Sequence, residues 1–138
     1  MDTASYPSGF FRSAVLMQMI ERYMSEPDVS KVYNAFLLAA DAHNGITRKS
    51  GEPYITHPLE VAGILADLHM DADTVSAALL HDVIEDTDYT KQQLAGHFGS
   101  TVADLVDGVT KLEMDKTYST KQEVVIASFH KMMQTMTD

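Results

Sequence analysis

Side chains that can bind a metal or transfer protons are concentrated in residues 79–87, where an apolar stretch contains His81, Asp82, Glu85 and Asp86. Because residues four apart share one face of an α-helix, we expect His81 and Asp82 each to lie above the carboxylate four positions later, in a single polar wedge. The like-charged Asp82–Asp86 pair destabilises such a helix by roughly 0.2–0.5 kcal/mol, and carboxylates near a helix C-terminus oppose its dipole. A sequence that breaks local rules in this way indicates a functional site, and a bound cation is the simplest compensation.

His57 is the second imidazole that could join this cluster, since it stands at the end of a predicted loop and directly before Pro58. Mixed imidazole and carboxylate ligands suit Mn²⁺, Fe²⁺, Zn²⁺ or Co²⁺ better than Ca²⁺ or a soft metal. Such a cation polarises phosphoryl oxygens, and Glu85 and Asp86 would then move protons or orient water. The alternatives are that His57–Pro58 is a capping arrangement and that the two carboxylates end a solvated helix without chemistry.

The loop 47–52 places Arg48 and Lys49 side by side in an otherwise acidic chain. Such a pair can hold a phosphate, and an arginine can stack on a base. Nine residues separate Arg48 from His57, so both can line one cleft. The alternative is a basic pair that is merely solvated, which is the usual state of charged loop residues.

The other histidines have no comparable neighbours in the sequence. His69 and His97 are expected at the surface, and His130 carries no signal of its own. His43 lies near Asp41, just before the basic loop, which leaves its role open.

Length and composition restrict the classes of protein that this chain can belong to. Its 138 residues predict one domain, spanning 1–138, and the absence of cysteine excludes disulfides, thiolate nucleophiles and cysteine-ligated zinc. A net charge of −10 argues against broad electrostatic binding of nucleic acid. No apolar run is long enough to cross a membrane, and the N-terminus lacks the basic region of a signal peptide. We therefore expect a cytoplasmic protein that binds neither nucleic acid nor membrane.

Helical periodicity dominates the sequence and strand signals are poor, which predicts an all-α fold with short connections and no sheet. Proline, glycine and capping residues mark the boundaries, and Gly45 is the expected stop of the second helix. The first predicted helix spans 13–25 before Pro27, and the second runs from Asp28 or Ser30 to Asn44. The third begins at Pro58 and is expected to bury Val61, Ile64, Leu65 and Leu68. The fourth runs from Asp73 or Thr74 through the polar cluster, and the others span 90–99, from Ser100 onward, and from Thr120 toward Asp138.

Three long motifs, at residues 48–58, 80–87 and 106–112, resemble the N-terminal hydrolase domain of the RelA/SpoT-type alarmone enzymes. These enzymes belong to the HD-domain phosphohydrolases. The resemblance covers roughly residues 33–138, and the motifs occur in the same order and at very similar intervals. Three ordered motifs are a far more specific signal than a single His-Asp pair.

The resemblance implies a compact multi-helix HD-domain bundle that removes the 3′-pyrophosphate from the alarmones ppGpp and pppGpp of the stringent response, giving GDP or GTP. The cation in the family is usually Mn²⁺. Carried over motif by motif, the metal ligands would be His57, His81 and Asp82, the catalytic acidic pair Glu85 and Asp86, and the contacts to the guanosine part Arg48, Lys49 and Ser50.

This chain departs from the family pattern at two places. The family supplies a further metal-binding Asp in a Lys-Leu-Ala-Asp-Arg-Leu-His-Asn type segment, which would begin beyond Asp138, so we expect an N-terminal fragment that ends before this motif. Residues 128–131 read Ser-Phe-His-Lys where the family often has Asn-x-Arg-Lys. The alternatives are an HD phosphohydrolase for another nucleotide, and a non-catalytic nucleotide-binding or regulatory helical module.

Overall fold

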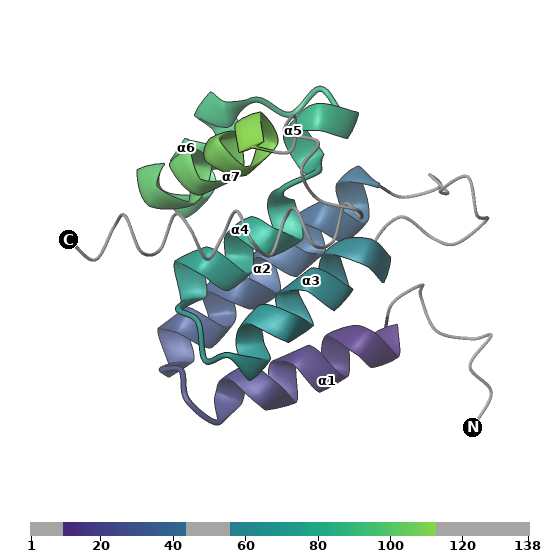
Figure 1. Cartoon of the computed structure of the whole chain (residues 1–138), viewed down its shortest axis with the longest axis vertical. Coiled ribbons are helices and arrows are strands. Elements are labelled where there is room, and N and C mark those ends of the chain that lie inside the picture. Colours follow the sequence, from purple (N-terminus) through teal and green to yellow (C-terminus); the bar gives the residue numbers. More distant parts are fainter. Residues whose placement is uncertain (1–9, 44–55, 113–138) are drawn as a thin grey trace.

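Helices make up almost all of the described backbone, residues 10–43 and 56–112, in the computed structural model of the protein (Figure 1). Side chains are described over 13–43 and 58–108. The helices are α1 (Phe10–Glu21), α2 (Glu26–Ala42), α3 (Thr56–Asp67), α4 (Ala72–Leu80), α5 (Val83–Asp86), α6 (Lys91–Phe98) and α7 (Ser100–Leu112). No strand occurs in these two ranges, so the predicted all-α fold is confirmed. The helix predicted from Thr120 lies outside the described residues.

The central helix is α4, which packs against α2, α3 and α7. It is buried along nearly its whole length, and Val75, Leu79 and Leu80 are fully inaccessible to solvent. Helices α1 and α6 add to this centre from outside, α1 against α2 and α3, and α6 against α7 (Figure 1). Full burial of an aliphatic side chain contributes about 1.5–3 kcal/mol, so the C-terminal end of α4 is a firmly held position in the fold. None of the helices in the described ranges is long and apolar enough to cross a membrane.

The first two helices begin earlier than the sequence predicted. Helix α1 starts at Phe10 and ends at Glu21, and Ser25 rather than Asp28 or Ser30 is the N-cap of α2. The Ser25 hydroxyl oxygen accepts from the backbone N–H of Asp28 (3.4 Å). Pro27 therefore lies inside the first turn of α2 instead of stopping α1, since a first-turn residue needs no hydrogen-bonded N–H. At the other end, α2 stops at Ala42, short of the predicted Asn44.

Helix α4 also begins earlier than predicted. Its N-cap is Asp71, whose carboxylate accepts from the backbone N–H of Thr74 (2.9 Å), and not Asp73 or Thr74. Asp73 instead lies in the first turn and pairs with the ammonium group of Lys31 on α2. Both carboxylates therefore lie at the helix N-terminus, where they complement its dipole.

The boundaries of α6 and α7 follow the predicted signals. Thr90 and Gln93 form a complete capping box, each side chain bonding the backbone N–H of the other. Gly99 ends α6 with φ +96°, a conformation that favours glycine. Ser100 then begins α7 directly.

Helix α3 carries Pro58 in its first turn, as predicted, and buries Val61 and Leu65. Ile64 is only partly buried. Leu68 is 52% exposed, so its place in the predicted buried stripe is wrong. The reason is that α3 ends at residue 67 and the chain turns away through His69, which has φ +57°.

The Tyr23 hydroxyl joins the α1–α2 turn to the α3–α4 turn by donating a hydrogen bond to the carbonyl oxygen of Met70 (2.7 Å). Its ring stacks on His69, with centroids 4.6 Å apart. Burial, and to a smaller extent the carboxylate of Asp71, raises the pKa of Tyr23 above its usual value of 10.0. The neutral hydroxyl is thus the form that the fold stabilises.

We expect Tyr23→Phe to lower the free energy of unfolding at neutral pH by about 0.5–1.5 kcal/mol, because the partly buried hydrogen bond to the Met70 carbonyl is lost. Since the pKa is higher in the folded than in the unfolded chain, this contribution is complete below about pH 10 and is lost as the pH rises through the folded-state value. Urea unfolding of both proteins at a series of alkaline pH values measures the difference. Equal stability of the two proteins at neutral pH would contradict the assigned role of the hydroxyl.

Candidate active site

The sequence predicted that one continuous helix carries the polar cluster, but the structure divides this segment between two helices. Helix α4 ends at Leu80, α5 begins at Val83, and His81 and Asp82 form the step between them. Both step residues keep right-handed backbone angles, φ −62° and ψ −27° for His81 and φ −92° and ψ −9° for Asp82. The step is anchored on its α5 side by Val83, whose side chain is fully buried.

The His81 side chain is fully buried, and its Nδ1 lies 2.6 Å from the carbonyl oxygen of Ala78. A carbonyl oxygen can only accept, so Nδ1 carries the proton and donates it. The other ring nitrogen, Nε2, then presents its lone pair, which is the form in which a neutral imidazole binds a metal. The backbone of α4 thus sets both the orientation and the tautomer of this histidine.

The His81 Nε2 atom lies 3.3 Å from Oδ2 of Asp82, whose side chain is only 1% exposed. Buried ionised carboxylates are found where they are paired or where they coordinate a metal. Two atoms that bond one ion at about 2.0–2.2 Å lie roughly 3–3.5 Å apart. The pair therefore has the donor types and the spacing of two ligands of one divalent transition metal.

His57 lies in the first turn of α3, not at the end of the preceding loop as predicted. Because α3 and α4 pack together and are joined by a short turn, the start of α3 lies at the same end of the molecule as the end of α4 (Figure 1). This backbone position suits a third ligand, but the His57 side chain lies outside the described part of the structure. Among the side chains that are described, no group of three or more His, Asp or Glu residues could hold a metal, so the ligand set stays a prediction.

The acidic pair follows the buried step by one helical turn. Glu85 and Asp86 reach solvent, and the Asp86 side chain is 26% exposed. Exposure therefore differs within the predicted polar wedge: His81 and Asp82 are buried, whereas the two residues one turn later are accessible. The arrangement instead separates two buried candidate ligands from two accessible carboxylates that can exchange protons with water.

The single turn of α5 is closed by Thr87. The Thr87 backbone N–H (3.1 Å) and hydroxyl (2.5 Å) both donate to the carbonyl oxygen of Val83. At the start of the turn, the backbone N–H of Asp86 donates to the carbonyl oxygen of Asp82 (2.9 Å). These bonds, with the burial of Val83, hold a turn that is too short to be stable by itself.

His43 is a residue that the sequence analysis left without a role. It is the C-cap of α2, and its Nε2 lies 3.5 Å from Oδ2 of Asp86. No spacing rule links positions 43 and 86, so only the packing of α2 beside the α4–α5 step could reveal this contact (Figure 1). His69 and His97 are exposed, as predicted, and His130 lies outside the described residues.

The predicted guanosine contacts, Arg48, Lys49 and Ser50, fall between α2 and α3 and lie outside the described residues. The end of α2 and the start of α3, which border this segment, both lie at the end of the molecule that carries the α4–α5 step (Figure 1).

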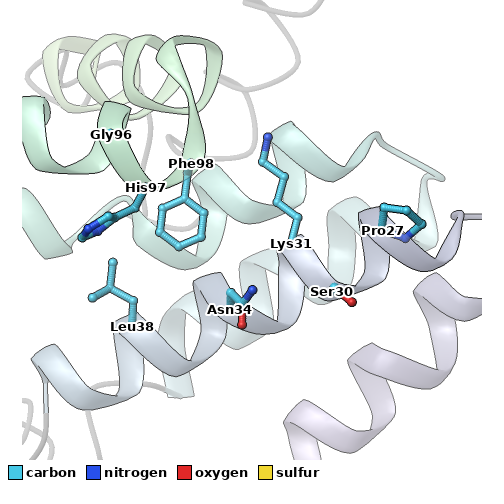
Figure 2. A pocket seen from close by; sticks show the side chains of 8 residues that line it. All are labelled: Pro27, Ser30, Lys31, Asn34, Leu38, Gly96, His97 and Phe98. Carbon is cyan, nitrogen blue, oxygen red and sulfur yellow. The ribbon is translucent and has the colours of Figure 1, made fainter.

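A groove of about 670 Å³ lies elsewhere, between α2 and α6 (Figure 2). Its lining includes Lys31, Asn34, His97 and Phe98. The Lys31 ammonium group, the cation that could attract a phosphate there, already pairs with Asp73. We therefore do not connect this groove with the chemistry of the His-Asp step.

Comparison with known proteins places this chain in a family. A profile of the HD domain matches residues 35–138. Over 121 residues, 88% of this chain, the protein is 49% identical to a Vibrio cholerae protein named guanosine-3′,5′-bis(diphosphate) 3′-pyrophosphohydrolase. It is 50% identical over the same share to the bifunctional (p)ppGpp synthase/hydrolase SpoT of Escherichia coli. A Myxococcus xanthus protein named GTP pyrophosphokinase is 47% identical over 119 residues, 85% of this chain.

The chain spans only 16–17% of the length of these relatives. The matched range nevertheless contains the α4–α5 step, the acidic pair and the His43 contact. The helical fold, the His-Asp step and the extent of identity agree, and the chain therefore belongs to the HD-domain family and, within it, to the SpoT/RelA group of (p)ppGpp synthases/hydrolases, whose N-terminal region it matches.

Proposed function

We propose that this protein hydrolyses ppGpp and pppGpp at the 3′-pyrophosphate, giving GDP or GTP and pyrophosphate. One observation carries the proposal: the buried His81 Nε2 and Asp82 Oδ2 lie 3.3 Å apart in the arrangement of two metal ligands. The identity of about half of the aligned residues with proteins named for this hydrolysis supports it. In this proposal residues 1–138 form one HD-type hydrolase domain that acts in the cytoplasm.

The residues that would hold the divalent cation are His57, His81 and Asp82, and we propose Mn²⁺ as the cation. Imidazole and carboxylate donors suit this ion, although neighbouring transition metals accept the same donors. When bound, the cation supplies a Lewis acid that polarises phosphoryl oxygens and favours the deprotonation of water. The hydrogen bond from His81 Nδ1 to Ala78 keeps the ring in the tautomer and orientation that this role needs.

Glu85 and Asp86 accept and donate the protons in the proposed reaction. Water attacks the phosphorus next to the ribose 3′ oxygen, and the bond between that phosphorus and the 3′ oxygen breaks. The attacking water loses a proton and the leaving 3′ oxygen gains one, which are the two tasks of a general base and a general acid. The two carboxylates are accessible and one turn from the buried step, where they can perform both transfers.

Arg48, Lys49 and Ser50 are proposed to contact the guanosine part of the substrate. Arg48 is five residues from His43, and a fully extended chain covers at most about 3.6 Å per residue. The Cα atom of Arg48 therefore lies within roughly 18 Å of the Cα atom of His43, the residue that contacts Asp86.

The test is to incubate the 138-residue protein with ppGpp and Mn²⁺ and to follow GDP and pyrophosphate by chromatography. We expect turnover that EDTA abolishes and that added Mn²⁺ restores, because the chemistry depends on the cation. GDP, GTP and ATP serve as comparison substrates, and efficient hydrolysis of these would favour an HD phosphohydrolase for another nucleotide. The His97→Ala variant, which changes an exposed histidine on α6, is the matched control and should retain full activity.

If the protein binds ppGpp and holds Mn²⁺ stoichiometrically after dialysis but releases no pyrophosphate, the result would indicate a nucleotide-binding module instead of a hydrolase. A protein that retains neither would contradict both interpretations and indicate a regulatory or dimerising helical domain.

A further inference from the structure

We propose that His43 is a positioning residue that holds the Asp86 carboxylate in its working orientation. The inference rests on the proposed function, because it gives His43 a part in the same reaction. It is based on a contact between two residues that are 43 positions apart in the sequence: His43 Nε2 lies 3.5 Å from Asp86 Oδ2.

The His43 ring is immobilised by α2. Its side chain is only 1% exposed, and its Nδ1 lies 2.9 Å from the carbonyl oxygen of Ala39. The same carbonyl oxygen also accepts the backbone N–H of His43 (3.1 Å), so its two lone pairs serve one residue. Because a carbonyl accepts only, Nδ1 is the donor and Nε2 is the ring atom directed at Asp86.

The partner carboxylate needs such an anchor. Asp86 is the last residue of α5, a helix of one turn, and its side chain is 26% exposed. An exposed acidic side chain samples several rotamers, whereas a proton-transfer group must be held within hydrogen-bond reach of one reacting atom. A buried, backbone-anchored imidazole beside Oδ2 favours one of these rotamers.

The distance of 3.5 Å defines the kind of contact. It is longer than a direct N–H···O hydrogen bond, but it lies within the range of an ion pair when Nε2 carries a proton as well as Nδ1. His43 acts through Asp86 and leaves the His81–Asp82 pair unchanged.

A purely structural role for His43 makes a different prediction. The ring fills space at the end of α2, and leucine, of similar size, would fill that space as well. Packing alone therefore predicts that His43→Leu is tolerated, whereas positioning predicts a loss of kcat that depends on the presence of the Asp86 carboxylate.

The first arm of the test does not require activity. Long-range ¹H–¹⁵N spectra of the full chain at neutral pH report the two ring nitrogens of each histidine. We expect Asp86→Asn to move the Nε2 resonance of His43 and to leave that of His97 in place. An unmoved His43 resonance overturns the proposal.

The second arm is a double-mutant cycle with ppGpp and Mn²⁺. We expect His43→Leu to lower kcat by about 10- to 100-fold with KM and Mn²⁺ stoichiometry unchanged, as for other residues that orient a functional group. In the Asp86→Asn background the same change should alter kcat less than about 2-fold, because the group that His43 positions is already gone. His43→Gln, whose amide can still donate to the carboxylate, should recover part of the lost rate.

The outcomes separate this inference from the proposed function. Additive losses of kcat, or loss of the metal in His43→Leu, overturn positioning, since the residue then acts independently or as a ligand. If the wild-type protein hydrolyses no alarmone, the proposed function fails, and the spectra alone decide whether His43 holds Asp86. If His43→Leu does not fold, the spectra of Asp86→Asn and the rate of His43→Gln still give the answer.

Discussion

Replacing His81 by alanine is expected to abolish the release of pyrophosphate from ppGpp and to remove the divalent cation from the protein. The loss of kcat/KM should be about 10³-fold or more, because a metal Lewis acid contributes several kcal/mol to the transition state and each 1.4 kcal/mol is a factor of ten. Asp82→Asn should have the same effect with a smaller change in volume, since it removes the charge that lies 3.3 Å from His81 Nε2.

The cation gives this prediction a readout that does not depend on catalysis. A ligand that binds only the folded state stabilises it by about 2.7 kcal/mol at a free concentration of 100 times Kd. The wild-type protein should therefore show a rise of Tm with added Mn²⁺, and both variants should show none. His97→Ala, as the matched histidine control, should behave like the wild type.

The variants are also compared without metal, because His81 is fully buried and its truncation destabilises the fold in its own right. A variant that is folded in EDTA, by circular dichroism, separates loss of the site from loss of the structure. Turnover at the wild-type rate by folded His81→Ala and Asp82→Asn would contradict the assignment of both residues as ligands.

The second large effect is expected at the acidic pair. Glu85→Gln and Asp86→Asn should each lower kcat by about 10²- to 10⁴-fold, the usual contribution of a general acid or base. An amide has nearly the shape of the carboxylate but cannot accept and return a proton at neutral pH. Both side chains reach solvent, so neither substitution buries a new amide in the core.

The distinguishing feature of this second prediction is that the metal should remain. The Mn²⁺-dependent rise of Tm should be the same in Glu85→Gln, Asp86→Asn and the wild type. Asp88→Asn is the matched control, since it removes an exposed carboxylate two residues after Asp86 and should retain activity. Wild-type kcat in both acidic variants would mean that the pair ends a solvated turn without chemistry, and loss of the metal would make them ligands instead.

Local sequence signals predicted most of the helices and several of their boundaries. The capping box of Thr90 and Gln93 and the left-handed Gly99 depend on neighbouring residues alone, so they could be predicted with their partners. The starts of α2 and α4 were misplaced because several residues near each start could serve as the cap. In the structure Ser25 and Asp71 are the caps, because their side chains accept from the backbone N–H three positions later.

By itself, the sequence determined the all-α fold, the chemical types of the candidate site and the family. These properties depend on periodicity and on motifs of consecutive residues, 48–58 and 80–87 above all, which need no knowledge of distant contacts. The prediction that His81, Asp82, Glu85 and Asp86 act together also came from adjacency.

Only the tertiary structure decided which of these four side chains are buried and which reach solvent. The break after Leu80, with His81 bonded to the Ala78 carbonyl and Val83 buried, turns one expected polar face into a buried pair and an accessible pair. The contact of His43 with Asp86 likewise exists because the end of α2 packs beside the α4–α5 step. Burial and contacts between distant segments are set by the packing of whole helices, and the period of a single helix cannot encode them.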